Sequence, residues 1–548
     1  MRVARFSPRL LALICFAAAG SLGQNSATPD TARLDQVAQS YVSAKQFMGS
    51  VLVARGDEIL FSKSYGSANL EWNVPNTPAT KFRIGSITKQ FTAASILLLE
   101  ERGKLKTDDL VKKYMPDAPA AWDEVTLFNV LTHTAGIPNF TSFPEFAEKS
   151  VLPMSVEKIV ALFKDKPLEF EPGAKFSYSN SDYVLLGYLI EKLSGQSYEK
   201  FLQDNIFTPL GMKDSGYDSN TAIIERRASG YSNSPAGPLN ADYVHMSIPH
   251  GAGALYSTTL DLLKWEQGLF GGKLLTPASL AKMTTPFKDN YGFGLVIRTT
   301  DGMKNIWHNG GIQGFNSSLA YYPESKITVA VLANLNGRAP DEMLPKLAAV
   351  AHGQAVHLTS ERPEIKLPKE TLARYVGTYE LETRINMIVT LDGEQLNSQL
   401  SGQRKFPLFA EAEGKFFLKV VDAQLEFVQD ADGKVTDAIL HQGGRDTKAR
   451  RTSDTVVERK EITLKPEILA AYPGQYQAGQ LVLTISLEGG RLMIQPSGQA
   501  KSELFAESET RFFLKIVDAQ IEFVKNENGS VTELTLHQGV IDLKAPRK

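Results

Sequence analysis

The sequence predicts an α+β fold that is followed by two small all-β domains. Three observations support this prediction: a β-hairpin pattern precedes a long apolar helix, three consecutive strand patterns cover residues 306–334, and the sequence beyond residue 369 repeats itself. Strands joined by short turns pair in antiparallel fashion, and a helix that is apolar on most sides has to be buried. We therefore expect an antiparallel sheet flanked by helices with a helical subdomain, and then two antiparallel β-barrel-like domains.

The composition describes a globular protein with about three domains. Its 548 residues exceed what one hydrophobic core usually organises. With 43% hydrophobic and 22% charged residues the chain lies in the ordinary globular range. Its formal net charge of −2 provides no excess of basic residues, so we expect no nucleic-acid partner.

The N-terminus has the pattern of a secretory signal. Three arginines precede an apolar run over residues 10–22, and small residues follow. We expect residues 1–23 to be a signal peptide and the protein to be exported, to the periplasm or the extracellular space. The run is shorter than the roughly 20 residues that cross a bilayer, and no later segment is long enough, so no membrane span is expected. The only cysteine, Cys15, lies in this run, which excludes cysteine chemistry in the remaining chain.

A hairpin and a long helix open the first folded region. Apolar residues alternate over residues 49–54 and 59–65 around a polar turn, which predicts an antiparallel hairpin. The helix that ends near Gly103 carries Ser86 and Lys89 at its start, and their spacing places them on one face. A partly desolvated lysine can lose its proton and activate a serine hydroxyl. The N–H groups at a helix start can also stabilise an oxyanion.

The Ser-x-x-Lys pattern alone is weak, because it occurs four times in this chain. The other copies begin at Ser155, Ser197 and Ser279. A serine near a helix start, followed by a solvated lysine, accounts for each of them. What distinguishes Ser86 is the set of motifs further along the chain.

Two polar segments in the middle of this region are candidates for a site. Residues 126–133 predict a short helix, and His133 at its end is either a functional group or, more commonly, a residue that caps the helix or packs beneath a loop. Residues 171–180 form a turn-rich loop before another apolar helix. Tyr178 and Asn180 lie two residues apart in it, so in an extended segment both side chains point the same way.

A strand that ends in two glycines provides a third polar motif. Residues 306–311 predict this strand, which contains His308 and ends at Gly310 and Gly311. A lone histidine on a strand is usually structural, but neighbouring glycines let a ligand approach the backbone. The histidines near residue 250 lack a third ligand, so we expect no metal site.

The tail contains two copies of one sequence unit. A linker with prolines and mixed charges follows residue 353. Residues 375–379 return as residues 472–476, and residues 416–424 return as residues 512–520, with a period near 96. A period of this length predicts two copied domains and not a solenoid. The expected boundaries are 24–355 for the main domain, 369–452 for the first repeat and 464–548 for the second.

Three motifs of the main domain resemble those of the penicillin-recognising serine hydrolases, in the same order. They are Ser86-x-x-Lys89, Tyr178-Ser179-Asn180 and His308-Asn309-Gly310. Residues 131–136 (Leu-Thr-His-Thr-Ala-Gly) and 209–212 (Pro-Leu-Gly-Met) resemble the class C β-lactamase-like branch. The resemblance covers about residues 35–350 and implies a β-lactamase-like sheet and helices there.

The resemblance also implies a role for each motif residue. Ser86 would be acylated, Lys89 would take or relay its proton, and Tyr178 would protonate the leaving group and later activate water. The N–H groups of Ser86 and Gly311 would form the oxyanion hole. The substrate-binding residues would be Asn180, His308, Gly310 and Gly311, and neither a metal nor another cofactor is implied.

The third motif departs from true class C β-lactamases, which have a lysine where this chain has His308. A fixed positive charge for a β-lactam carboxylate is therefore lost or depends on pH. A histidine there resembles certain DD-peptidases and D-aminopeptidases of the family, and the latter also carry two β-barrels after the catalytic domain. We expect an exported serine hydrolase that cleaves an amide or ester in a peptide with D-amino acids. The alternatives are an esterase or weak β-lactamase of the same family, and an inactive ligand-binding relative.

Overall fold

The structure is a computed structural model that describes residues 30–548 except 235–236, 301, 382–384, 443–444, 457–460, 480, 498–500 and 539–540. The expected signal peptide, residues 1–23, lies outside the described residues. The described residues divide into two compact units, one made of those within 30–39 and 46–355, the other of those within 40–45 and 356–548. Within the described part of the chain, no helix has the length and apolar character needed to cross a membrane.

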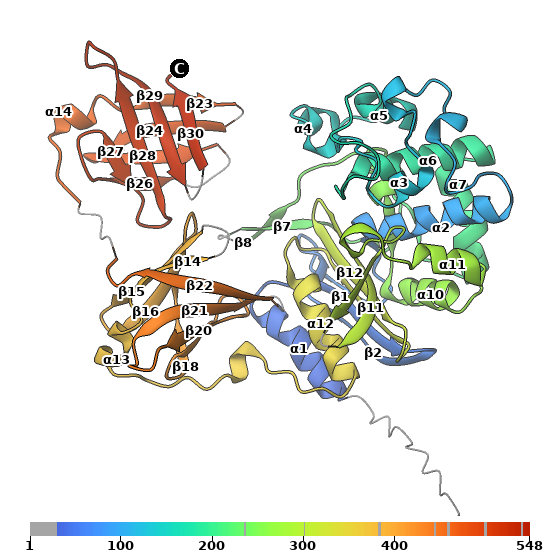
Figure 1. Ribbon diagram of the computed structural model, residues 1–548, viewed down its shortest axis with the longest axis horizontal. Coiled ribbons are helices and arrows are strands. Elements are labelled where there is room, and N and C mark those ends of the chain that lie inside the picture. Colours follow the sequence, from blue (N-terminus) through green and yellow to red (C-terminus); the bar gives the residue numbers. More distant parts are fainter. Residues whose placement is uncertain are drawn as a thin grey trace, which may run out of the picture. The chain divides into compact units, whose positions relative to one another are not determined.

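The first unit is built around a six-stranded antiparallel sheet (Figure 1). In spatial order its strands are β10 (Val296–Thr300), β11 (Met303–Ile312), β12 (Phe315–Tyr322), β13 (Ile327–Ala333), β1 (Gly49–Arg55) and β2 (Glu58–Tyr65). The N-terminal hairpin thus joins the later meander through β1 and β13, in a register that pairs Gly49 with Ala333. β13 and β1 are buried along almost their whole length, because helices cover both faces of the sheet.

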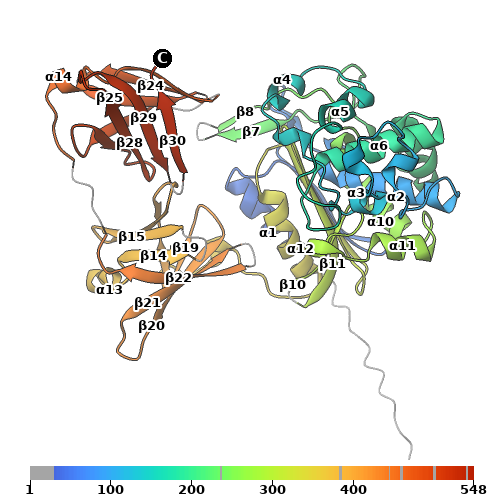
Figure 2. The same cartoon turned by 45° about the horizontal axis from the view of Figure 1, so that its top comes forward.

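Helices lie on both sides of this sheet (Figures 1 and 2). They are α1 (Thr31–Ser43) and α12 (Ala339–Ala351) on one side, and α2 (Thr88–Glu101), α10 (Thr259–Phe270) and α11 (Pro277–Met283) on the other. α2 is buried on nearly all sides, as its apolar sequence predicts. Its Phe91 ring stacks on Trp265 of α10 with the ring centres 4.0 Å apart. The start of α2 is therefore held firmly in place.

A helical subdomain is inserted between α2 and α10. It contains α3 (Leu127–Leu131), α4 (Phe146–Lys149), α5 (Val156–Phe163), α6 (Asn180–Ser194), α7 (Tyr198–Leu202), α8 (Thr208–Leu210) and α9 (His250–Gly253). Three small sheets complete the unit: β3 (Ser67–Asn69) with β4 (Val74–Pro75), β5 (Phe82–Arg83) with β9 (Leu255–Ser257) and β6 (Gly216–Tyr217), and β7 (Tyr231–Ser234) with β8 (Gly237–Asn240).

The start of α6 differs from the sequence prediction. The prediction leaves Asn180 in the loop, whereas in the structure Asn180 is the first helical residue and Ser179 is the extended residue before it. Ser179, Asn180 and Ser181 are all good cap residues, so the sequence does not decide among them. Gly195 ends the helix as predicted, with a φ of +71° that favours glycine.

The second unit consists of two antiparallel sheets, each preceded by a short helix, α13 (Lys369–Ala373) or α14 (Pro466–Leu469). The first sheet has the strands β14 (Gly377–Leu381), β15 (Asn386–Asp392), β16 (Gln395–Leu400), β17 (Phe406–Pro407), β18 (Phe409–Ala412), β19 (Lys415–Leu418), β20 (Ala423–Gln429), β21 (Val435–Gln442) and β22 (Arg445–Ser453). The second has β23 (Gly474–Ala478), β24 (Leu481–Glu488), β25 (Arg491–Pro496), β26 (Ser502–Ala506), β27 (Arg511–Phe513), β28 (Ala519–Lys525), β29 (Val531–Gln538) and β30 (Ile541–Pro546).

Both sheets are nearly closed, because a strand from the start of each repeat pairs with its end. β14 pairs with both β15 and β22, and Tyr476 of β23 pairs with the residue that follows β30. One hydrogen bond recurs in the two copies: Tyr379 Oη donates to the Tyr375 carbonyl, and Tyr476 Oη to the Tyr472 carbonyl, both at 2.8 Å. The predicted fold class is confirmed, including the two barrel-like tail domains.

Candidate active site

Ser86 lies in a single 3₁₀ turn, Gly85–Ile87, that leads directly into α2. Lys89 lies in the first turn of α2, and its Nζ is 3.0 Å from Ser86 Oγ. The contact expected from the spacing of the two residues is therefore present. Because α2 is rigidly packed, the amine and the hydroxyl are held at hydrogen-bonding distance.

The Lys89 amine is completely buried and has three polar neighbours. Nζ contacts Asn180 Oδ1 at 2.9 Å and the Ala252 carbonyl at 2.8 Å, in addition to Ser86 Oγ. Burial lowers the pKa of Lys89 well below its ordinary value, an effect that a negative charge on Asp182 would oppose. A neutral amine has two hydrogens and one lone pair. The two carbonyl oxygens can take the hydrogens, which leaves the lone pair for the Ser86 hydroxyl.

We expect kcat/KM to rise with pH through an acidic limb that lies well below 10.5, the ordinary pKa of lysine. Only unprotonated Lys89 can accept the serine proton, and burial moves its protonation to lower pH. The check is a pH profile of kcat/KM with an uncharged substrate from about pH 5 to about pH 10. A rate that keeps climbing to the upper end of this range would mean that the lysine is unperturbed.

Tyr178 lies in the extended segment before α6 and places its ring beside the same amine. The ring centre is 4.8 Å from Lys89 Nζ. Burial raises the pKa of the Tyr178 phenol well above its ordinary value, and its hydrogen bond with Ser86 offsets this only in part. The phenol is therefore protonated at neutral pH and can donate a proton. The three residues predicted to be catalytic, from two distant segments, thus meet in one place.

The backbone of β11 supplies an N–H group beside Ser86. Ile312 immediately precedes the two-residue turn to β12, so it and Phe315 form a hydrogen-bonded pair across the two strands. Pairs alternate along an antiparallel ladder, so the preceding residue, Gly311, forms a pair with Asn316 that is not hydrogen-bonded. The Gly311 N–H consequently points away from β12. On that side β11 has no partner strand, because β10 pairs with β11 only as far as Trp307. A Cβ on Gly85 would come within 2.8 Å of Gly311 N, so the two backbones lie close together. This geometry supports the predicted oxyanion hole.

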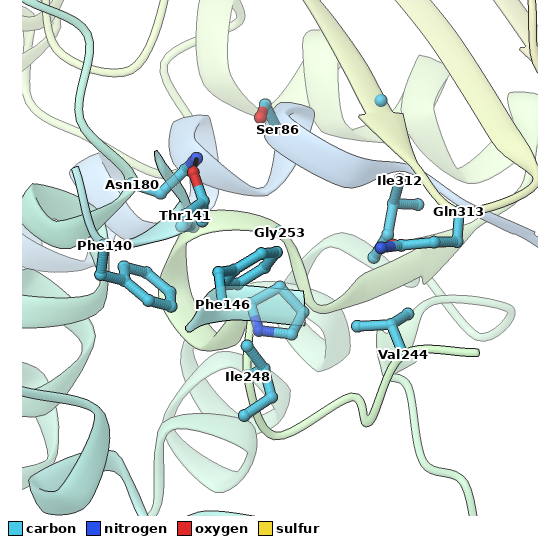
Figure 3. A pocket seen from close by; sticks show the side chains of 13 residues that line it. Ser86, Phe140, Thr141, Phe146, Asn180, Val244, Ile248, Gly253, Ile312 and Gln313 are labelled. Carbon is cyan, nitrogen blue, oxygen red and sulfur yellow. Dashed lines mark hydrogen bonds between the residues drawn. The ribbon is translucent and has the colours of Figure 1, made fainter. Parts of the chain in front are cut away.

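A pocket of about 320 Å³ opens beside Ser86 (Figure 3). It is lined by Ser86, Phe140, Thr141, Phe146, Asn180, Val244, Ile248, Pro249, Ala252, Gly253, Gly311, Ile312 and Gln313. Figure 3 shows Ser86 between Asn180 on one side and Ile312 on the other. None of these lining residues is ionisable at neutral pH, and most of the side chains are apolar. The pocket therefore suits an uncharged, largely apolar group.

His308 and Gly310 are not among the described residues that line this pocket. The His308 ring is buried; its Nε2 is 3.2 Å from Tyr291 Oη, and its ring centre is 6.3 Å from that of Tyr178. Burial lowers the pKa of His308 to about 3, so the ring is neutral at neutral pH. The histidine consequently supplies no positive charge. Its contact with a substrate stays a prediction.

Two residues of the same buried region, Asp182 and Tyr291, carry no sequence signal. Asp182 looks like an ordinary acidic residue in the first turn of a helix, and Tyr291 lies in a loop without a motif. In the structure both contact His133, whose ring centre is 4.9 Å from that of Tyr291 and 4.5 Å from that of Tyr178. His133 was expected to be either a functional group or a residue that caps a helix or packs beneath a loop. In the structure it is buried beneath the Tyr178 loop and contacts the site.

Comparisons with known proteins match both parts of the chain. The sequence profile of the family described as Beta-lactamase matches residues 34–353. The profile of a domain of unknown function, DUF3471, matches twice, at residues 361–452 and 458–545. The second result agrees with the internal repeat.

Individual relatives extend this result. Penicillin-binding protein 4* of Bacillus subtilis (strain 168) is 31% identical over 435 residues, which make up 74% of this chain and 95% of that protein. The structure of the octameric penicillin-binding protein homologue from Pyrococcus abyssi is 28% identical with a TM-score of 0.55, over 77% of this chain and 100% of the other. The D-amino acid amidase from Ochrobactrum anthropi SV3, solved with D-phenylalanine, is 26% identical with a TM-score of 0.53, over 59% and 98%. The chain therefore belongs to the beta-lactamase family, as a relative of penicillin-binding proteins and D-amino acid amidases with two DUF3471 domains at its C-terminal end.

Proposed function

We propose that this protein is an exported serine hydrolase that forms an acyl-enzyme on Ser86 and cleaves an amide or ester bond in a peptide containing D-amino acids. The observation that carries the proposal is the 3.0 Å contact between Lys89 Nζ and Ser86 Oγ in a buried site. Desolvation that favours the neutral amine makes Lys89 a base for the hydroxyl next to it. Membership of the beta-lactamase family supports the same chemistry.

The proposed reaction has an acylation and a deacylation step. Lys89 accepts the Ser86 proton as Oγ attacks the carbonyl carbon, and the N–H groups of Ser86 and Gly311 stabilise the oxyanion. One such donor contributes about 3 kcal/mol in comparable hydrolases. Tyr178 protonates the leaving group as the C–N or C–O bond breaks, and recovers a proton from the Lys89 ammonium. In deacylation the Tyr178 hydroxyl takes a proton from the attacking water as it passes its own hydrogen to the neutral Lys89 amine. The Lys89 ammonium then protonates Ser86 Oγ as the acyl bond breaks, which restores the free enzyme.

The pocket supports an uncharged substrate with an apolar side chain next to the scissile bond. Phe140, Phe146 and Ile248 offer it apolar surface. Asn180 borders the same pocket; its Oδ1 is held by Lys89, and its Nδ2 faces Thr141 Oγ1 at 3.2 Å, so the amide is oriented for a substrate carbonyl. The relative that is named a D-amino acid amidase supports a D-configured amide as the substrate class.

An esterase is the second candidate, because the same groups cleave esters, which open more easily than amides. An efficient β-lactamase is disfavoured by His308, which is buried and neutral and so cannot bind a β-lactam carboxylate as a fixed cation would. A weak β-lactamase activity is compatible with the site. A binding protein without turnover is the alternative from another class.

A Ser86→Ala substitution tests the proposal. The wild-type protein is expected to react with a fluorophosphonate probe, and to turn over members of a panel of D-aminoacyl amides, short-chain esters and a chromogenic cephalosporin. The variant is expected to lose labelling and turnover, because no other hydroxyl is in contact with Lys89 Nζ among the described residues. Labelling of the variant at the wild-type level would place the nucleophile elsewhere.

Ser155 provides the matched control. It begins another Ser-x-x-Lys pattern and is exposed, so Ser155→Ala should behave like the wild type in labelling and turnover. If the wild type is neither labelled nor active on any member of the panel but retains an apolar ligand tightly, the binding-protein alternative holds instead.

A further inference from the structure

A buried pair of titratable side chains, His133 and Asp182, lies near Lys89 and Tyr178. His133 Nδ1 is 2.8 Å from Asp182 Oδ2, and both side chains are almost entirely inaccessible to solvent. The Ser179 backbone N–H also donates to the same Nδ1, at 3.3 Å. A ring nitrogen that accepts a hydrogen bond carries no proton, so His133 is the Nε2–H tautomer. The hydrogen between the ring and the carboxyl group must then reside on Asp182.

An ionised Asp182 would be less well satisfied. Its Oδ1 has no hydrogen-bond donor, so a charged carboxylate oxygen would be buried without a partner. A proton on Nδ1 of His133 would also face the Ser179 N–H, donor against donor. A protonated carboxyl leaves a neutral carbonyl oxygen unpaired, which costs less than an unpaired charge, whereas His133 Nε2 has no hydrogen-bond partner in either charge state. Burial has the matching effect on both groups, since it raises the pKa of Asp182 well above its ordinary value and lowers the pKa of His133 well below.

The charge on Asp182 affects the basicity of Lys89. The titratable groups facing the pair are Lys89 of α2, Tyr178 before α6, Tyr183 of α6, Tyr291 before β10, His308 of β11 and Glu169 of the loop after α5. A carboxylate at position 182 would attract a proton to Lys89 and weaken it as an acceptor for the Ser86 hydrogen. A neutral carboxyl group at that position does not.

We propose that His133 and Asp182 share one proton and so form a neutral positioning pair. The pair holds the Tyr178-Ser179 segment in place and keeps a negative charge away from Lys89. This inference rests on the proposed function, in which Lys89 is the base. His133 holds the segment in two ways, through the bond to Ser179 N–H and through the Tyr178 ring, 4.5 Å away between centres. The backbone of His133 has a φ of +55°, which is uncommon for a residue with a side chain, and its ring is fully buried.

Two substitutions at position 182 test the pair. Asparagine is uncharged and keeps an N–H donor for Nδ1, so kcat of Asp182→Asn should stay within about threefold of the wild type, and the acidic limb of kcat/KM should stay within about 0.3 pH unit. Leucine cannot donate, so Asp182→Leu should lower kcat at least about tenfold as Tyr178 loses its support, with little change in KM. Circular dichroism establishes that each variant is folded.

Either of two kinetic results would overturn the proposal. A shift of the acidic limb in Asp182→Asn by about one pH unit to lower pH would mean that an ionised Asp182 had been holding Lys89 protonated. An unchanged kcat in Asp182→Leu would mean that the pair does not position Tyr178.

A second measurement needs no substrate. Nitrogen-15 NMR of protein labelled in histidine, with His133 assigned by the signal that His133→Gln removes, should show a neutral Nε2–H tautomer throughout the range from about pH 5 to about pH 9. An imidazolium or an Nδ1–H tautomer would overturn the proposal. Because no acylation is involved, this result can be read even if Ser86 proves not to be the nucleophile, so the two failures are distinguishable.

Discussion

Replacing Lys89 by methionine is expected to lower kcat/KM by roughly 10³-fold or more while the protein stays folded. Methionine fills the same buried volume but has no lone pair for the Ser86 proton, so the hydroxyl loses its only basic neighbour among the described contacts. Thermal unfolding should occur at or above the wild-type temperature, because the variant no longer buries an amine. Steady-state kinetics and a melting curve measure the two effects.

The chain offers a matched control for this experiment. Lys158 stands three residues after Ser155 in another Ser-x-x-Lys pattern, but its side chain is exposed. Lys158→Met should therefore leave kcat/KM unchanged. If Lys89→Met kept a tenth or more of the wild-type kcat/KM, the buried amine would not be the base, and another group would have to activate Ser86.

The substitution Gly310→Ala, which adds one methyl group, is expected to lower kcat/KM by about 10²-fold or more and to destabilise the fold by about 1–3 kcal/mol. A Cβ at this position would lie 1.9 Å from the Ile84 carbonyl oxygen and 2.5 Å from Ser317 Oγ. Backbone cannot yield as a flexible side chain can, so β11 would have to move away from the turn that carries Ser86. The oxyanion donors of Ser86 and Gly311 would then separate.

Gly311→Ala is the matched control for Gly310→Ala. The closest atom to a Cβ there is Asn316 Nδ2 at 3.3 Å, the end of a side chain that can adjust, and the N–H group is retained. We expect less than a tenfold loss of kcat/KM and little change in melting temperature. Equal damage from both alanines would show that the steric contact of Gly310 with Ile84 is not what positions β11.

Local patterns in the sequence predicted much of the fold. Short apolar segments bounded by turn residues gave the strands of the hairpin and the meander to within a few residues, although β1 and β13 are buried on both faces and need no alternation. The start of α6 was placed too late, since Ser179, Asn180 and Ser181 compete as caps. The two tail domains followed from direct repetition of the sequence.

Only part of the candidate site could be predicted from the sequence. Ser86 and Lys89 are one turn apart, so their contact is a local property of a helix start. Tyr178 was added by its resemblance to a family motif, and the structure places its ring beside Lys89. Tyr291 and Asp182 could not be found in this way, because neither their spacing nor their residue type differs from that of ordinary surface residues.

The sequence by itself determined the order of the elements, the duplication of the tail and the three ordered motifs, because these depend on residue type and spacing along the chain. Only the tertiary structure decided that His308 is buried, that His133 meets Asp182, and that Gly311 N lies close to the turn of Ser86. The physical reason is that the exclusion of water from a group, which sets its pKa and its partners, depends on side chains that are far apart in the sequence.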